Sequence, residues 1–279
     1  MKVDVHAHCI QPEHVTAGAH SKMERSGYPP MAPTEFDHFM REMEPVDKAI
    51  CFGVRARGTG TMTPDEYTSE WVSRAPEKLL GFMAIDPMEE DYLEKIDRAA
   101  SELGLCGIKL HPILGRYNPA DPKIFPLYEK AIDLGLPILT HMGAHPDDRV
   151  SLKQSEPLLF DDVAQAFSEL KIVVAHMAHP WQRDCAVVLR KHPNVYADVS
   201  GAGWVRPWQA WQGLTLMVEW GVADKLLFGS DFPFWTPSEG MEKLRRLNDQ
   251  VEGTGFPRIP DDVVEGIINR DALGLLGIG

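Results

Sequence analysis

Short apolar segments alternate with longer amphipathic segments along the whole chain. Eight short segments are rich in apolar residues, and several, such as Lys171-Ile-Val-Val-Ala175, lack polar alternation. Continuous apolar runs of this length are typical of parallel strands that are covered on both faces. We therefore predict strands at residues 2–9, 48–54, 79–85, 105–110, 137–141, 171–176, 194–199 and 225–230.

Apolar residues recur every three or four positions in the segments between these strands, which is the helical period. The pattern predicts helices over 92–103, 126–134, 158–170, 181–191, 208–220 and 241–247, with one or two closing helices in 261–276. Gly104, Gly135 and Gly221 directly follow three of them. Glycine is favoured there because it readily adopts the left-handed conformation that ends a helix.

Eight strands that alternate with helices predict an α/β protein, a (β/α)8 TIM barrel that forms a single domain over residues 1–279. An open doubly wound sheet is the alternative, but its first strand would normally lead into a glycine-rich phosphate-binding turn. Here the first strand leads into His6-Ala7-His8-Cys9. Residues 10–33 then form a long loop rich in Pro, Gly, His and Ser. In a barrel this loop would lie over the catalytic face, so it is a candidate lid.

Composition narrows the class of protein. Hydrophobic residues make up 44% and charged residues 25% of the 279 positions, which is typical of a globular protein and excludes a disordered chain or a coiled coil. The formal net charge of −13 argues against a nucleic-acid partner. No segment approaches the roughly 18 apolar residues of a membrane span. We expect a small-molecule substrate and no membrane partner, and the sequence leaves open whether the chain forms a homo-oligomer.

The cysteines and the first residues bear on location. The four cysteines are scattered, without a Cys-x-x-Cys pair, at positions 9, 51, 106 and 185. Scattered cysteines in apolar segments indicate reduced, buried thiols rather than a disulfide framework. The chain opens with Met-Lys-Val-Asp and has no apolar leader before its first strand. We therefore expect a cytoplasmic protein.

Polar residues gather where the predicted strands end. These are His6 and His8, Lys109 and His111, His141, His176, and Asp231 after the eighth strand. The carboxyl ends of barrel strands converge on one face, where active sites lie. Residues two apart on a strand point the same way, so His6 and His8 can bind one cation. His141 and Asp231 would complete a mixed nitrogen and oxygen set suited to Zn²⁺ or a similar ion.

A single strand histidine is more often a packing residue than a ligand. Five others fit such ordinary roles: His14, His20, His38, His145 and His192. Four histidines and an aspartate at the ends of the first, fifth, sixth and eighth strands are harder to explain by chance. A purely structural zinc is disfavoured, because such sites are usually closed and rich in cysteine.

Four motifs together resemble the amidohydrolase superfamily. They are His6-x-His8, Pro137-Ile-Leu-Thr-His141-Met-Gly143, Ala175-His176-Met177 and Leu227-Phe-Gly-Ser-Asp231-Phe-Pro233. The similarity is closest to the amidohydrolase-related branch, which includes hydrolases and the aminocarboxymuconate-semialdehyde decarboxylase group. Residues 268–277 resemble the closing helix of that branch. His-x-His alone is a weak signal, but the four motifs in order span nearly the whole chain.

The resemblance implies a ligand set and roles. His6, His8, His141 and Asp231 match the ligands of one divalent ion, for which we expect Zn²⁺, with Mn²⁺ as the alternative. His176 matches a histidine that hydrogen-bonds the substrate or the metal-bound water. Asp231 matches a residue that both touches the metal and moves a proton. A bound cation lowers the pKa of water, and an adjacent carboxylate can accept the released proton.

Lys109 admits three interpretations. In two-metal relatives a carbamylated lysine at this position bridges two ions, with histidines such as His141 and His176 on the second. Alternatively, a free ammonium neutralises a substrate carboxylate or a developing oxyanion. A purely structural lysine would pair with a carboxylate of the barrel. We favour the free ammonium and one ion, because this branch mostly uses a single ion.

We predict substrate-binding residues from their position after a strand end. His111 follows the fourth strand, Arg57 the second, and Trp204 and Arg206 the seventh. A guanidinium at the rim could pair with a carboxylate in a bidentate manner. Tryptophans at helical spacing, such as Trp208 and Trp211, more often serve packing. The set favours a small, planar or aromatic, carboxylated substrate.

Three functions are compatible with these residues. The first is a metal-dependent hydrolase, in which metal-activated water attacks a lactone, ester or amide carbonyl with Asp231 as base. The second is a nonoxidative decarboxylase, in which the metal holds the substrate and Asp231 protonates carbon as CO₂ leaves. The third is a catalytically silent barrel whose metal is structural. The fold does not choose between the first two.

Overall fold

Eight parallel strands form a barrel in the computed structural model, which describes residues 1–18, 21, 33–201 and 206–278. In spatial order these are β1 (Val3–His8), β2 (Lys48–Phe52), β5 (Leu79–Ala84), β6 (Ile108–Leu110), β7 (Ile138–Thr140), β8 (Ile172–Val174), β9 (Val195–Asp198) and β10 (Leu226–Leu227). The main chain of β1 closes the barrel against the segment after β10, since Val5 N donates to Phe228 O at 3.0 Å and His8 N to Phe232 O at 2.9 Å. The predicted (β/α)8 barrel is confirmed.

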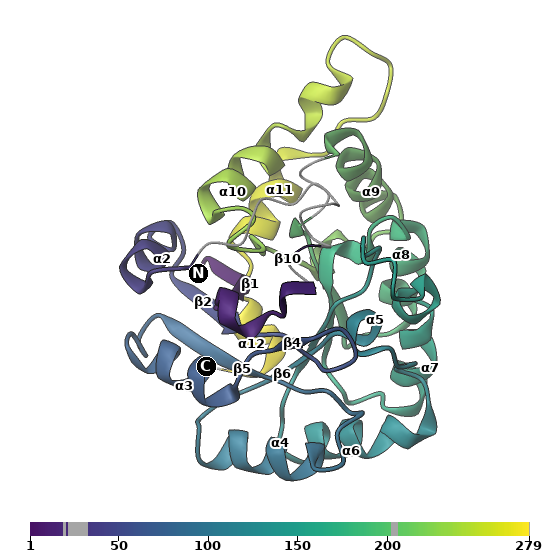
Figure 1. The fold of residues 1–279 in the computed structure, drawn as a ribbon. Helices are drawn as coiled ribbons and strands as arrows, with labels where there is room; N and C mark the ends of the chain where they lie inside the picture. The colour runs from purple at the N-terminus through teal and green to yellow at the C-terminus, as the bar shows by residue number, and fades with distance from the viewer. Residues whose placement is uncertain (19–20, 22–32, 202–205, 279) are drawn as a thin grey trace.

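Helices surround the barrel (Figure 1). They are α2 (Phe36–Glu42), α3 (Asp65–Ser73), α4 (Tyr92–Ser101), α5 (Pro112–Gly115), α6 (Phe125–Asp133), α7 (Leu159–Ala166), α8 (Gln182–Lys191), α9 (Pro207–Glu219), α10 (Pro237–Arg245), α11 (Asp261–Ile268) and α12 (Ala272–Leu276). Gly104, Gly135 and Gly221 have φ values of 66°, 65° and 64°, which confirms them as left-handed helix ends. Among the described residues, no helix is long and apolar enough to cross a bilayer.

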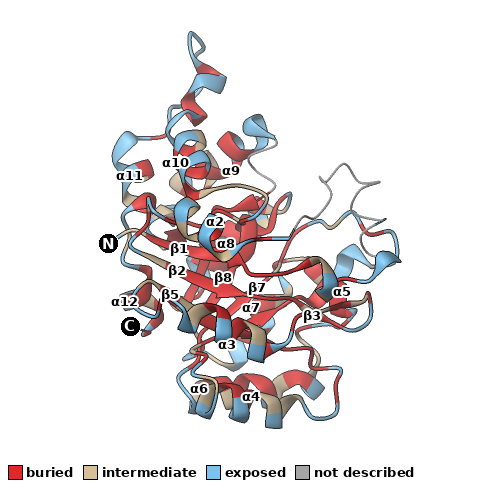
Figure 2. Ribbon diagram, turned by 60° about the vertical axis from the view of Figure 1, so that its left-hand side comes forward, coloured by how far each residue is buried: buried red, intermediate tan, exposed pale blue. Residues whose placement is uncertain are grey.

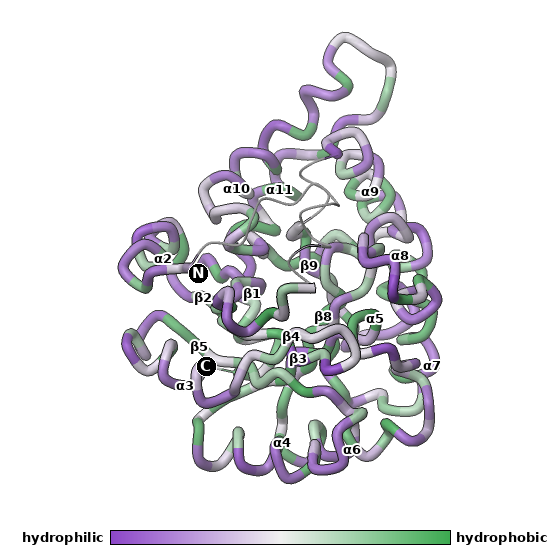
Figure 3. Tube along the Cα trace, in the orientation of Figure 1, coloured by the Kyte–Doolittle hydropathy of each residue, from purple (hydrophilic) through white to green (hydrophobic). Residues whose placement is uncertain are grey.

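Burial follows the layers of the barrel. The strands are buried, and the outer helix faces are exposed (Figure 2) and hydrophilic (Figure 3). One apolar cluster joins Val5, Phe52 and Val173 of the strands to Leu273 and Leu276 of α12. The last helix therefore packs on the barrel interior from the end where the strands begin. All four cysteines are free thiols, and Cys9, Cys51 and Cys185 are buried.

Each predicted strand is present, although most are shorter than predicted. The sixth ends at Val174 because His176, Met177 and Ala178 have φ values of 59°, 48° and 52° and turn the chain away. The sequence analysis missed α2, α3 and a two-stranded antiparallel hairpin, β3 (Arg55–Ala56) and β4 (Thr61–Met62). The buried face of α3 is formed by Asp65, Thr68 and Trp71, so it lacks a clear hydrophobic period.

The long loop after β1 begins at the pocket described below. Ile10 and Val15 line that pocket, and Val15 forms an isolated antiparallel bridge with Thr61 of β4. A short 3-10 helix, η1 (Pro12–His14), separates these two residues. Residues 19–20 and 22–32 lie outside the described residues, so the prediction of a lid concerns a segment that is described only at residues 10–18, 21 and 33.

Candidate active site

Three of the four predicted ligands converge on one point. His6 and His8 extend from the end of β1, and Asp231 follows β10. His6 Nε2 lies 3.3 Å from His8 Nε2, and each nitrogen lies 3.3 Å from Asp231 Oδ1. Two atoms bound about 2.1 Å from one ion at tetrahedral angles are separated by about 3.4 Å. The spacing and the mixed donor set therefore fit one divalent cation.

A buried aspartate, Asp4, connects the two segments that carry these ligands. Oδ1 of Asp4 accepts the main-chain N–H of His6 and of Ser230, each at 3.0 Å. Asp231, whose φ is 66°, donates its own N–H to the carbonyl of His6 at 2.8 Å. Burial raises the pKa of Asp4 to about 7. Asp4 thus ties the turn that carries Asp231 to the strand that carries both histidines.

His6 is oriented by a second carboxylate. Its Nδ1 lies 2.8 Å from Oδ2 of Asp198, at the end of β9. Burial and the positive charge of the nearby Lys109 together lower the pKa of His6 to about 3, although Asp198 and Asp231 oppose the shift. Burial likewise lowers the pKa of His8. Both imidazoles are therefore neutral, which is the form that binds metal.

Lys109 lies on β6 directly beside this donor set. Its side chain is buried, with Nζ 3.5 Å from His6 Nε2 and 4.4 Å from the centre of the Phe52 ring. Burial lowers the pKa of Lys109 to about 7, although the charges of Asp198 and Asp231 oppose the shift. The prediction that Lys109 points inward is borne out by this position.

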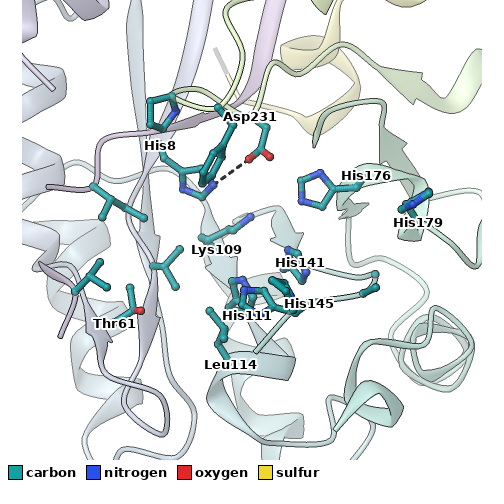
Figure 4. A pocket seen from close by; sticks show the side chains of 18 residues that line it. His8, Thr61, Lys109, His111, Leu114, His141, His145, His176, His179 and Asp231 are labelled. Atoms are coloured by element: carbon teal, nitrogen blue, oxygen red, sulfur yellow. Dashed lines mark ion pairs between the residues drawn. The ribbon is translucent and has the colours of Figure 1, made fainter. Parts of the chain in front are cut away.

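His176 lies near the same donor set, on the side of Asp231 opposite His8 (Figure 4). Its ring centre lies 4.8 Å from that of His6 and 5.1 Å from that of His141. The pKa of Asp231 is lowered overall: burial raises it, but the neighbouring His176, His8 and His6 outweigh that. Asp231 is therefore held as a carboxylate, 3.3 Å from the imidazoles of His6 and His8.

His141 lies in the same pocket but outside the three-atom donor set. Its ring stacks on that of His111, with centres 4.1 Å apart and planes at 8°. Burial holds the pKa of both histidines well below the usual range, so both are neutral. His111 Nδ1 and His141 Nε2 are buried and have no hydrogen-bond partner among the described residues. Both nitrogens are thus available to a ligand.

The pocket has a polar floor and an apolar wall. The floor carries His8, Lys109, His141, His176 and Asp231. The wall is formed by apolar residues from segments that follow several strands: Ile10, Val15, Val54, Leu114 and Pro233. Figure 4 shows the floor residues pointing toward one another around Lys109. The empty space is about 970 Å³, including the open mouth.

The other predicted substrate residues lie elsewhere. Arg57 is exposed in the hairpin between β3 and β4, where its N–H donates to Asp86 Oδ2 at 2.9 Å. Val54 and Thr61 occupy the pocket side of that hairpin. Arg206 is exposed at the start of α9 and does not line the pocket, and Trp204 lies outside the described residues.

Two pocket histidines were missed by the sequence analysis. His145 and His179 line the cavity beside His141 and His176. They follow the fifth and sixth strands by a few residues. Proximity to a strand end, the signal used for the other histidines, could have identified both.

Comparisons with known proteins agree with this architecture. A curated relative, the 2-amino-3-carboxymuconate-6-semialdehyde decarboxylase of Dictyostelium discoideum, is 22% identical over 253 residues, which cover 77% of this chain and 65% of the relative. The chain thus matches less than two thirds of the length of that protein.

Two solved structures illustrate the likeness of the fold. A probable 2-pyrone-4,6-dicarboxylic acid hydrolase from Acinetobacter baumannii has a TM-score of 0.69 and 16% identity, over 99% of both chains. A dihydroxybenzoic acid decarboxylase from Polaromonas sp. JS666, with bound manganese and the inhibitor 2-nitroresorcinol, has a TM-score of 0.66 and 17% identity, over 99% of this chain and 96% of its own. At such identities the likeness concerns the fold.

The match to a family model covers almost all of the described structure. It runs from residue 3 to residue 278 and therefore includes β1, β10 and every histidine of the pocket. The chain belongs to the amidohydrolase family.

Proposed function

We propose that this protein is a metal-dependent nonoxidative decarboxylase of a small aromatic or unsaturated acid. The sequence alone favoured a hydrolase, with decarboxylation as the alternative. The name of the curated relative supports the alternative, and the solved neighbours include a decarboxylase and a hydrolase. Within the family, the choice depends on where the pocket would hold a carboxylate.

The position of Lys109 carries the proposal. Among the described residues that line the pocket, Lys109 is the only lysine or arginine, and it lies at the floor beside the metal donor set. A carboxylate attracted to this cation therefore lies at the reaction centre itself. A hydrolase for a carboxylated lactone would instead need a cation away from the reacting carbonyl. The apolar wall opposite Lys109 suits a ring or an unsaturated chain.

The chemistry follows from this placement. The bond between the carboxylate carbon and its neighbour breaks, the electron pair stays on the neighbour, and CO₂ leaves. That neighbouring carbon then takes a proton that Asp231 or His176 has first accepted from solvent, since these are the groups at the floor that can carry it.

We assign one divalent ion to the site, held by His6, His8 and Asp231 with His141 as the further ligand. Among the described residues, two groups could hold a metal, and they share His6. Both Zn²⁺ and Mn²⁺ suit this donor set. A bound cation would supply positive charge that holds substrate oxygens and offsets the charge left when the bond breaks. Lys109 then acts as an unmodified ammonium.

The test separates the two reactions in one assay. Purified protein loaded with Mn²⁺ or Zn²⁺ is incubated with hydroxybenzoates and with carboxylated lactones, and CO₂ and released acid are measured separately. We expect CO₂ from an aromatic monocarboxylate and none from the His8→Ala variant. Release of acid from a lactone without CO₂ would overturn the proposal in favour of the hydrolase.

A further inference from the structure

Asp198 accepts hydrogen bonds from His6 and from the turn that carries His176, although it does not line the pocket. It ends β9 and is fully buried. Oδ2 faces His6 Nδ1 at 2.8 Å. Oδ1 accepts the main-chain N–H of His176 at 2.9 Å, that of Ser200 at 3.0 Å, and the Ser200 hydroxyl. One carboxylate thus contacts a predicted metal ligand and the turn that presents His176.

The contact with Asp198 fixes the tautomer of His6. An ionised carboxylate only accepts hydrogen bonds, so His6 Nδ1 must carry the proton. Its Nε2 is then an unprotonated nitrogen, and it is this atom that lies 3.3 Å from both His8 Nε2 and Asp231 Oδ1. His6 is therefore prepared to bind a cation before the cation arrives.

The surroundings of His176 also fix its tautomer, again with the proton on Nδ1. Its Nδ1 lies 3.1 Å from the main-chain carbonyl of Ser200, which can only accept, and 2.9 Å from the Ser200 hydroxyl. That hydroxyl donates its proton to Asp198 and so offers only lone pairs to the imidazole. His176 Nδ1 therefore carries the proton, and Nε2 is left as a proton acceptor.

The backbone supports this arrangement. His176 has a φ of 59°, a left-handed conformation that non-glycine residues rarely adopt, and its main-chain N–H donates to Asp198 Oδ1, which helps to hold it there. Gly201 packs against the ring, because a Cβ at this position would lie 2.4 Å from His176 Nδ1. The ring of His176 is thus confined by Ser200 and Gly201 of the turn after β9.

We propose that Asp198 and Ser200 are positioning residues that set the proton on both His6 and His176, so that both Nε2 atoms act as acceptors. The inference rests on the proposed metal site but not on the choice between decarboxylation and hydrolysis. In the neutral ring of His176, Nε2 is then the atom that can accept a proton and, in the decarboxylation proposed above, pass it on to carbon.

An asparagine at position 198 would reverse the proton on His6. The amide oxygen would take the place of Oδ1, because three donors point there. The amide NH₂ would then face His6 Nδ1, which must lose its proton to accept. His6 Nε2 would become protonated and unable to bind a cation, although the shape of the side chain is unchanged.

The test measures tautomers and metal affinity. Long-range ¹H–¹⁵N spectra of metal-free protein distinguish protonated from unprotonated imidazole nitrogens, and competition with a chromogenic chelator gives the Kd for Mn²⁺ and Zn²⁺. In the wild type we expect Nδ1–H on His6 and His176. For Asp198→Asn we expect Nε2–H on His6 and a loss of metal affinity of about 10–100-fold. Ser200→Ala should keep the His176 tautomer, because the carbonyl of residue 200 remains.

A matched control separates positioning from burial. Asp65 is also buried, and its Oδ1 accepts the main-chain N–H of Ala84 at 2.8 Å. Asp65→Asn should change the melting temperature without changing metal affinity. Nε2–H on His6 or His176 in the wild type would overturn the inference even if Asp198→Asn does not fold, and so would unchanged metal affinity in a folded Asp198→Asn. Wild-type protein that shows the expected tautomers but binds no cation would refute the metal site instead.

Discussion

At the scale of the residue, His8 tests the proposed metal site. It contributes one nitrogen to the donor set and lies at the end of β1, at the floor of the pocket. We predict that His8→Ala loses most of its bound metal and its activity but keeps its melting temperature within a few degrees. Elemental analysis after dialysis and a thermal scan check this. His38→Ala, at an exposed histidine, is the control.

Full metal occupancy in His8→Ala would refute the ligand assignment. A collapse of the melting temperature would mean that His8 is a structural residue, in which case loss of metal would only reflect unfolding. The His38→Ala control should match the wild type in both measurements.

Lys109 separates the one-ion from the two-ion interpretation. For Lys109→Met we predict an unchanged content of about one metal per chain and a large loss in substrate binding or turnover. The side chain is buried, and burial lowers its pKa to about 7, so removal of its charge should not destabilise the fold. Metal analysis and a thermal scan check both points. Two tightly bound ions in the wild type, with one lost on substitution, would favour a carbamylated bridge.

Some residues of the site could be predicted from the sequence and others could not. His6, His8 and Asp231 were predicted because each follows a strand end and two share one face of a strand. Asp198 and Ser200 were not, because β9 carries no histidine and their role depends on how β9 lies against β1 and the turn after β8. The signal for such residues is three-dimensional.

At the scale of the element, the turn after β9 and the end of α9 provide a matched pair of glycines. Gly201 has a φ of 78° and would place a Cβ 2.4 Å from His176 Nδ1, whereas Gly221 has a φ of 64° and nothing within 4 Å. Alanine should cost each position about 1–2 kcal/mol of folding free energy from backbone strain alone. Gly201→Ala should additionally lose kcat, because the ring of His176 must move.

Denaturant unfolding and steady-state kinetics on both variants check this prediction. We expect Gly221→Ala to lose stability at unchanged kcat. Equal kcat in the two variants would show that the close packing of Gly201 on His176 has no part in the reaction.

The strands of the barrel were predictable because each is a short, continuous apolar run. The hairpin of β3 and β4 was not, because two-residue strands leave no periodic pattern. The same hairpin explains why Arg57 is absent from the pocket. Val54 and Thr61 flank the exposed turn that carries Arg57 and fill the pocket side of it, and the sequence does not reveal this reversal.

At the scale of the whole molecule, stability and chemistry lie at opposite ends of the barrel. The donor set lies where the strands end, and α12 packs on apolar residues where they begin. Leu276 of α12 is buried in a cluster with Val3, Val5 and Leu227. The last helix thus closes the barrel interior at the end remote from the pocket, as expected for a fold whose catalytic and stabilising faces are separate.

This separation predicts that a substitution which lowers stability at one end of the barrel leaves metal affinity at the other end unchanged. Leu276→Ala should lower the free energy of unfolding by about 2–5 kcal/mol, because a buried leucine leaves a cavity. In the folded protein its metal affinity should equal that of the wild type, since Leu276 packs in an apolar cluster and the proposed ligands lie where the strands end. His8→Ala should show the reverse. Denaturant unfolding and chelator competition on both variants check the pair. If Leu276→Ala also lost metal affinity, the packing of α12 would affect the position of the ligands through β1. The two ends of the barrel would then be energetically coupled.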